Sequence, residues 1–198
     1  MTTKTILMLG LGILMAYTLY SCSEETVQAG PATAAQPVVL SQEQLMEKGE
    51  HLVVTLGCGD CHSPKIFTAM GPVPDSAKAF SGHPAGDKLP GFDKKVLGSW
   101  VLMNHSTTAA IGPWGISYAA NITPDATGIG NWSLEQFSRA VREGKAKGLE
   151  RARTLLPPMP WPSYARLDDE ELKAIFVYLQ SLPAVSNIVP EPVAPEMP

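Results

Sequence analysis

The segment Cys58–His62 reads Cys-Gly-Asp-Cys-His and places two thiols and an imidazole next to one another. Two thiols at this spacing can add to the two vinyl groups of one porphyrin, and the adjacent imidazole can bind its iron. A structural zinc site usually needs four nitrogen or sulfur ligands, and the remaining cysteine, Cys22, lies far away. A thioredoxin-like disulfide belongs to a βαβ unit, and no such alternation is visible. The motif therefore predicts one covalently attached haem c, held by Cys58 and Cys61, with His62 on the iron.

The amino terminus resembles a bacterial lipoprotein signal. Lys4 precedes an apolar run over residues 6–19, and Ser21 stands directly before Cys22. Cleavage before Cys22 would remove residues 1–21 and leave that cysteine as the lipidated first residue. The alternative is a retained anchor helix, although the run is shorter than the roughly 20 residues of a membrane span. Either arrangement predicts a membrane-anchored protein on the periplasmic or cell-surface side.

Composition divides the rest of the chain into one domain between two tails. Residues 22–40 and 186–198 are rich in Pro, Ala and polar residues, so we expect a flexible tether and a flexible Pro-rich tail. Residues 41–185 then form the globular domain. A chain of 198 residues with 44% hydrophobic content has enough apolar side chains to build a buried core. A net charge of -4 argues against nucleic acid as a partner.

Three sequence patterns predict helix starts, at Ser41, Ser133 and Asp168. Each is an N-cap residue followed three positions later by Gln or Glu, as in a capping box. The first and last helices carry apolar stripes, at Leu45, Leu52, Val53 and Leu56 and at Leu172, Ile175, Phe176, Leu179 and Leu182. Gly49 offers a place for another helix to approach closely. Because no convincing strand pairs are visible, we expect an all-α domain.

A helix leading into Cys-x-x-Cys-His, long loops and a closing amphipathic helix together resemble the class I cytochrome c fold. The resemblance implies long ordered loops around one covalently bound haem. It also implies that the first and last helices cross near Gly49 and the turn 176–179, behind the haem.

A narrower resemblance lies in residues 121–125, 127–133 and 158–164, which read Asn-Ile-Thr-Pro-Asp, Thr-Gly-Ile-Gly-Asn-Trp-Ser and Pro-Met-Pro-Trp-Pro-Ser-Tyr. These stretches are similar to haem domains in the cytochrome subunits of membrane-bound bacterial alcohol and sugar-acid dehydrogenases. Such subunits usually hold several haem domains in tandem, whereas this chain has one Cys-x-x-Cys-His motif. The resemblance implies electron transfer and leaves open whether the chain belongs to a dehydrogenase complex.

The sixth iron ligand is expected to be Met159. A methionine thioether opposite histidine is typical of cytochromes c, and prolines at 157, 158, 160 and 162 predict a stiff loop around this residue. In the resembled family the methionine of this motif is the ligand. Met103, His105 and Met70 remain alternatives. For the other ring nitrogen of His62, the class I resemblance implies a proline carbonyl as acceptor, and Pro72 is the candidate.

Together these features predict a protein that carries single electrons between respiratory partners and catalyses no reaction itself. Its donor would be a dehydrogenase, and its acceptor an oxidase or another cytochrome. The alternatives are a dedicated cytochrome subunit of a periplasmic dehydrogenase, or a haem sensor or enzyme with an open sixth site. A basic cluster between residues 139 and 153 could dock an acidic partner, neutralise haem propionates, or simply be a solvated face.

Overall fold

The computed structural model describes residues 39–195, except residues 94, 96 and 98. The expected signal peptide 1–21, Cys22 and nearly all of the tether lie outside the described residues. Every element named below belongs to one compact unit that begins at Leu40. No helix among the described residues is long and apolar enough to cross a membrane.

Three helices begin where the capping residues predict: α2 (Gln42–Thr55), α4 (Leu134–Arg142) and α6 (Asp169–Ser181). Ser41 and Asp168 form complete capping boxes. Ser133 also accepts a hydrogen bond from the backbone N–H of Gln136. The Gln136 side chain, however, donates to the carbonyl of Lys147 at 2.9 Å, which ties α4 to a later turn. The prediction of three capped helices is therefore confirmed, with one capping box replaced by a tertiary contact.

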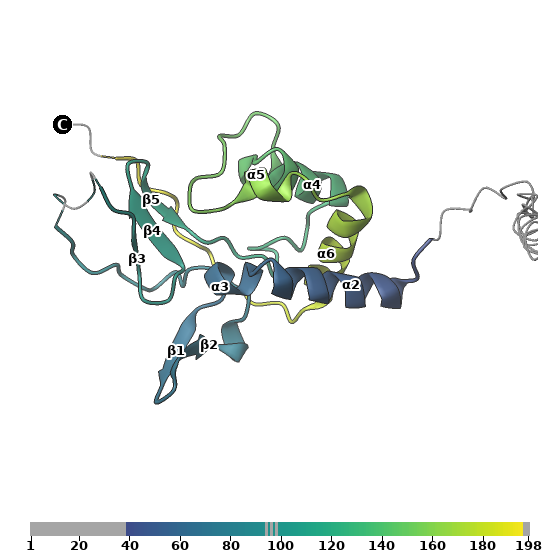
Figure 1. The fold of residues 1–198 in the computed structure, drawn as a ribbon, viewed down its shortest axis with the longest axis horizontal. Coiled ribbons are helices and arrows are strands. Elements are labelled where there is room, and N and C mark those ends of the chain that lie inside the picture. The colour runs from purple at the N-terminus through teal and green to yellow at the C-terminus, as the bar shows by residue number, and fades with distance from the viewer. Residues whose placement is uncertain (1–38, 94, 96, 98, 196–198) are drawn as a thin grey trace, which may run out of the picture. The chain divides into compact units, whose positions relative to one another are not determined.

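Helices α2 and α6 pack against each other where Gly49 meets α6 (Figure 1). A Cβ atom added to Gly49 would clash with the carbonyl oxygen of Ala174 and lie 2.7 Å from Cβ of Tyr178. The absence of a side chain at Gly49 thus lets the two backbones touch. The crossing that the resemblance implied is present, centred on Ala174 and Tyr178.

The core lies between these two helices, α4 and the loop before α4. Phe137 packs against Phe176 with ring centroids 5.2 Å apart. The buried cluster consists of Val53, Ile129, Phe137, Leu172, Ile175 and Leu179. Leu52, Leu56 and Cys58 pack against it from the end of α2, so the haem-binding motif adjoins the core.

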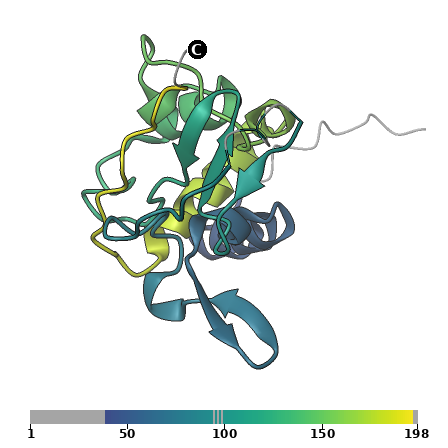
Figure 2. The ribbon, with the colours of Figure 1, turned by 90° about the vertical axis from the view of Figure 1, so that its left-hand side faces the viewer.

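The expectation of an all-α fold is wrong, because the domain contains two antiparallel sheets. Strands β1 (Lys65–Thr68) and β2 (Gly71–Pro74) form a hairpin that projects from the helices in Figures 1 and 2. Strands β3 (Leu102–Met103), β4 (Ala109–Gly112) and β5 (Gly115–Tyr118) form a second sheet in that order. The β1–β2 and β4–β5 hairpins each turn through two residues and have a glycine with positive φ after the turn, Gly71 and Gly115. These strands are too short to show a period in the sequence.

The remaining elements are short: α3 (Cys58–His62), η1 (Ser76–Lys78), η3 (Ala146–Gly148) and α5 (Trp161–Tyr164).

The segment after α6 differs from the flexible tail that we expected. Val193 pairs with Ile116 through two backbone hydrogen bonds of 2.8 and 3.0 Å, beside β5. Asn187 donates to two backbone carbonyls and accepts from one backbone N–H. Figure 2 shows this yellow segment returning along the loops. We call residues 183–195 the strap.

The packing at Gly49 predicts a measurable cost of adding a methyl group there. Gly49→Ala improves helix propensity, but the new Cβ meets a backbone carbonyl that cannot rotate away, so we expect the free energy of unfolding to fall by about 2 kcal/mol. Chemical denaturation monitored by circular dichroism measures this change in the free energy of unfolding. Gly86→Ala is the matched control, because nothing lies within 4 Å of a Cβ added at that position. Equal stability of Gly49→Ala and the wild type would contradict the packing described.

Candidate haem site

The motif begins where α2 ends. Leu56 closes α2, and Gly57, with φ of 68° and ψ of 28°, turns the chain in the left-handed region that favours glycine. The next residues form α3, which carries both thiols and the imidazole on little more than one helical turn. Cys58 and Cys61 are half-buried free cysteines. The structure thus brings together the three motif residues that the sequence singled out.

The ring of His62 is fixed by a backbone carbonyl. Its Nδ1 atom lies 2.7 Å from the carbonyl oxygen of Ala120, in the segment that follows β5. A carbonyl only accepts, so Nδ1 carries the proton and Nε2 keeps its lone pair for a metal. The acceptor is not Pro72, the candidate from the sequence. Pro72 lies in β2, where it pairs with Phe67 in the projecting hairpin.

The protonation states of the motif follow from its surroundings. Burial lowers the pKa of His62, and the hydrogen bond to Ala120 opposes this effect. The imidazole is therefore neutral at neutral pH, as a metal ligand must be. Burial raises the pKa of the Cys58 thiol to about 11 and raises that of Cys61 as well. Both thiols are therefore protonated at neutral pH before a thioether bond to haem forms.

Lys65 and Thr107 hold the carboxyl end of α3. The Lys65 ammonium donates to the carbonyls of Asp60 at 2.9 Å and Ser63 at 2.6 Å. The Thr107 hydroxyl donates to the same Asp60 carbonyl. A cation at the carboxyl end of a helix is favourable because the last carbonyls have no partner within the helix. The role of Lys65 was not predicted, although a lysine three residues after the motif is a recognisable signal.

Met159 lies in the loop before α5 and is half-buried. The loop is fixed on both sides of it. The Ser117 hydroxyl, from β5, donates to the carbonyl of Pro157 at 2.6 Å. The Tyr164 hydroxyl, at the end of α5, donates to the carbonyl of Leu56 at 2.9 Å, two residues before Cys58. Burial raises the pKa of Tyr164, and Cys58, Cys61 and Asp60 raise it further, so this hydroxyl lies close to the motif.

The alternative sixth ligands lie on more exposed parts of the domain. Met70 stands at the tip of the β1–β2 hairpin with 95% of its surface exposed. Met103 is 43% exposed, and His105 is an exposed residue that packs edge-on against Phe67, with ring centroids 5.1 Å apart. These surroundings favour Met159 over all three.

The comparisons with known proteins agree with this geometry. A family model described as Cytochrome c matches residues 46–183, which include the motif and Met159. The chain belongs to the cytochrome c family. The prediction of a c-type cytochrome is thus confirmed, and membership of this family implies covalently bound haem c.

Several cytochrome subunits of bacterial dehydrogenases are related to this cytochrome. The gluconate 2-dehydrogenase cytochrome c subunit of Pantoea cypripedii is 34% identical over 139 residues, which cover 70% of this chain and 23% of the relative. The fructose dehydrogenase cytochrome subunit of Gluconobacter japonicus is 46% identical over 71 residues, which cover 35% of this chain and 14% of the relative. The alcohol dehydrogenase (quinone) cytochrome c subunit of Gluconobacter oxydans is 43% identical over 67 residues, which cover 33% of this chain and 13% of the relative. The cytochrome therefore spans less than a quarter of the length of these relatives.

The donor set of α3 fits haem c. Two thiols and an imidazole with a free Nε2 lone pair are what covalent attachment and axial ligation require. Among residues 39–195 outside positions 94, 96 and 98, no group of three or more His, Cys, Asp or Glu side chains could hold a metal ion. The described part of the chain therefore offers no further ligands to a zinc site built on Cys58 and Cys61.

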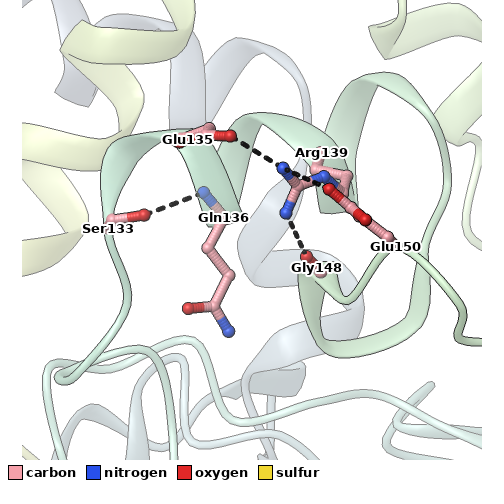
Figure 3. Close-up of polar contacts among 6 residues, drawn as sticks. All are labelled: Ser133, Glu135, Gln136, Arg139, Gly148 and Glu150. Carbon is pink, nitrogen blue, oxygen red and sulfur yellow. Dashed lines mark hydrogen bonds and ion pairs between the residues drawn. The ribbon is translucent and has the colours of Figure 1, made fainter.

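Several side chains of the basic cluster form ion pairs and hydrogen bonds within the domain. Arg139 pairs with Glu135 at 2.8 Å, faces Glu150 at 3.7 Å and donates to the carbonyl of Gly148 at 3.1 Å (Figure 3). Arg142 pairs with Asp169 at 2.8 Å, and Lys147 with Glu191 at 2.9 Å. Arg139 and Arg142 join α4 to the turn after it and to α6. Lys147, in that turn, joins it to the strap. Such internal pairing favours a structural role for the cluster over partner docking.

Two features near the site have no clear signal in the sequence. Ala120 acts through its backbone oxygen, which any residue could supply. His83 is completely buried, with Nδ1 2.9 Å from the Thr108 hydroxyl and its ring against Tyr118. Its backbone N–H donates to the carbonyl of Ala119, next to Ala120.

We expect covalent haem attachment to require the motif thiols. In a Cys58→Ser, Cys61→Ser variant, acidified acetone should extract all haem, because no thioether bond then holds the porphyrin. In the wild type and in Cys22→Ser the haem should stay with the polypeptide. Haem-stained denaturing gels read out both results. Covalent haem in the double variant would contradict the assignment.

Proposed function

We propose that this cytochrome binds one haem c and carries single electrons between redox proteins at a membrane surface outside the cytoplasm. Cys58 and Cys61 would attach the haem, and His62 and Met159 would bind its iron. When bound, the haem supplies a one-electron Fe(III)/Fe(II) couple. The observation that carries the proposal is the position of His62. Its ring shares one short helix with both thiols, and its Nδ1 proton is held by Ala120.

The residues of this chain have separate tasks in that function. The Ala120 carbonyl orients the imidazole and, by accepting a hydrogen bond from its Nδ1–H, makes it a stronger donor to iron. Met159 supplies a soft, neutral sulfur that favours the ferrous state. Hydrogen bonds from Ser117 and Tyr164 hold its loop in place. Because reduction requires no rearrangement of these bonds, we expect little structural change on electron transfer.

We propose the domain organisation and location read from the sequence. Residues 1–21 would be the signal peptide, residues 22–40 the tether, residues 41–185 the haem domain and residues 186–198 the C-terminal tail. Lipid on Cys22 would anchor the mature protein on the periplasmic or cell-surface side. The Cys22→Ser variant should then leave the membrane fraction while keeping its haem.

A second candidate function is that of a dedicated cytochrome subunit of a dehydrogenase. The relatives favour it, because the three described above are cytochrome subunits of dehydrogenases. Under this proposal the electron donor is a substrate dehydrogenase, and an oxidase or another cytochrome is the acceptor. Stable co-purification with a dehydrogenase would distinguish a fixed subunit from a mobile carrier.

Optical spectra of the purified holoprotein test the proposed ligation. We expect a low-spin haem that does not bind carbon monoxide and that shows a sulfur-to-iron charge-transfer band when oxidised, as methionine ligation produces. Met159→Ala should lose this band and bind carbon monoxide. Met103→Ala is the control and should behave as the wild type. A high-spin wild type that binds carbon monoxide would instead support a sensor or enzyme with an open sixth site.

A further inference from the structure

Residues 81–83 lie beside the hydrogen bond between His62 and Ala120. The backbone N–H of Gly82 donates to the carbonyl of His62 at 2.8 Å. On its other side, Gly82 touches the peptide of Ala120: an added Cβ would lie 2.6 Å from the Ala120 oxygen. Gly82 also has a φ of 78°, which favours glycine. Gly82 therefore lies between the main chain of His62 and the Ala120 carbonyl, which accepts the hydrogen bond from the His62 ring.

Asn187, in the strap, holds the residues on both sides of Gly82. Its side-chain amide donates to the carbonyls of Ser81 at 2.7 Å and His83 at 2.9 Å. Its Oδ1 atom accepts from the backbone N–H of Ala85 at 2.9 Å. Both ends of the amide are thus used by the Ser81–Ala85 backbone, more than 100 residues away in the sequence.

The same strap also holds the other side of Ala120. Asn121, its direct neighbour, is 4% exposed and donates to the carbonyl of Val185 at 2.8 Å. The Asn187 backbone N–H in turn donates to the Thr127 hydroxyl at 2.9 Å, and that hydroxyl accepts from Asn121 at 3.1 Å. The strap therefore fixes the residue after Ala120 as well as the segment packed against it. Asn187 lies beyond residue 183, where the family match ends.

We propose that Asn187 is a positioning residue for the axial histidine: by holding residues 81–83, it keeps the Ala120 carbonyl aligned with the Nδ1 proton of His62. This inference rests on the proposed ligation of haem by His62. Without the Asn187 side chain, residues 81–83 lose two hydrogen bonds and Ala85 loses a third, so the Gly82 segment can move away from Ala120. The Nδ1 proton is then less well held, and the imidazole donates less charge to iron.

The test is proton NMR and potentiometry on the oxidised holoprotein. In Asn187→Ala, we expect the hyperfine-shifted Nδ1 proton of His62 to exchange with solvent about tenfold faster than in the wild type. We also expect a higher reduction potential, because a weaker hydrogen bond to Ala120 stabilises the ferric state less. Asn187→Asp keeps an acceptor for Ala85 but loses both donors, so it should shift both readouts in the same direction. It serves as the test if Asn187→Ala does not retain haem.

Arg142→Ala is the control for general loosening of the fold. It removes contacts of 2.8 Å to Asp169 and to the Leu167 carbonyl, at the junction of α4 and α6. We expect it to lower thermal stability while leaving the proton exchange rate and the potential at their wild-type values. Unchanged exchange in the Asn187 variants, or an equal change in Arg142→Ala, would overturn the positioning role. A wild type whose haem is not bound by His62 would instead refute the proposed function.

Discussion

At Gly49 the backbones of α2 and α6 meet without a side chain between them, and the position of the haem motif depends on that contact. Helix α2 leads through Leu56 and Gly57 directly into α3. A helix that packs this closely can neither slide nor rotate freely, because a shift would drive it into the carbonyl of Ala174. The core on the inner side of α2 therefore fixes where α3 begins.

From there, polar contacts take over from apolar packing. The Ala120 carbonyl fixes the ring of His62, Gly82 fixes its main chain, and Lys65 and Thr107 hold the end of α3. Two of these four partners, the Ala120 carbonyl and the Gly82 N–H, are backbone groups of loops, and the Asn121 and Asn187 side chains connect those loops to the strap. The long loops are thus ordered by a continuous hydrogen-bond network. This explains how a domain with little regular structure around its site can hold a ligand rigidly.

The sequence was informative wherever structure is decided locally. Capping residues at Ser41, Ser133 and Asp168 located three helices because an N-cap acts within one turn. The Cys-x-x-Cys-His motif identified the site because covalent chemistry demands that spacing. The sheets were missed because strands of two to four residues, such as Leu102–Met103 and Ala109–Gly112, show no alternation.

Contacts between distant segments could not be predicted in the same way. The acceptor for His62 is a backbone oxygen at Ala120, and a backbone oxygen has no sequence signature. Asn187 looked like part of a flexible tail because its neighbours are mostly prolines and small residues. Only the fold reveals that its amide has three backbone partners in the segment that follows η1.

The central claim is that one haem, held by a single motif, carries one electron at a time. A reversible potentiometric titration of the purified protein, with haem content measured on the same sample, tests it most directly. We expect one haem per polypeptide and a single transition that follows the Nernst equation for one electron in both directions. Two transitions, more than one haem per chain, or the absence of a reversible transition would contradict it.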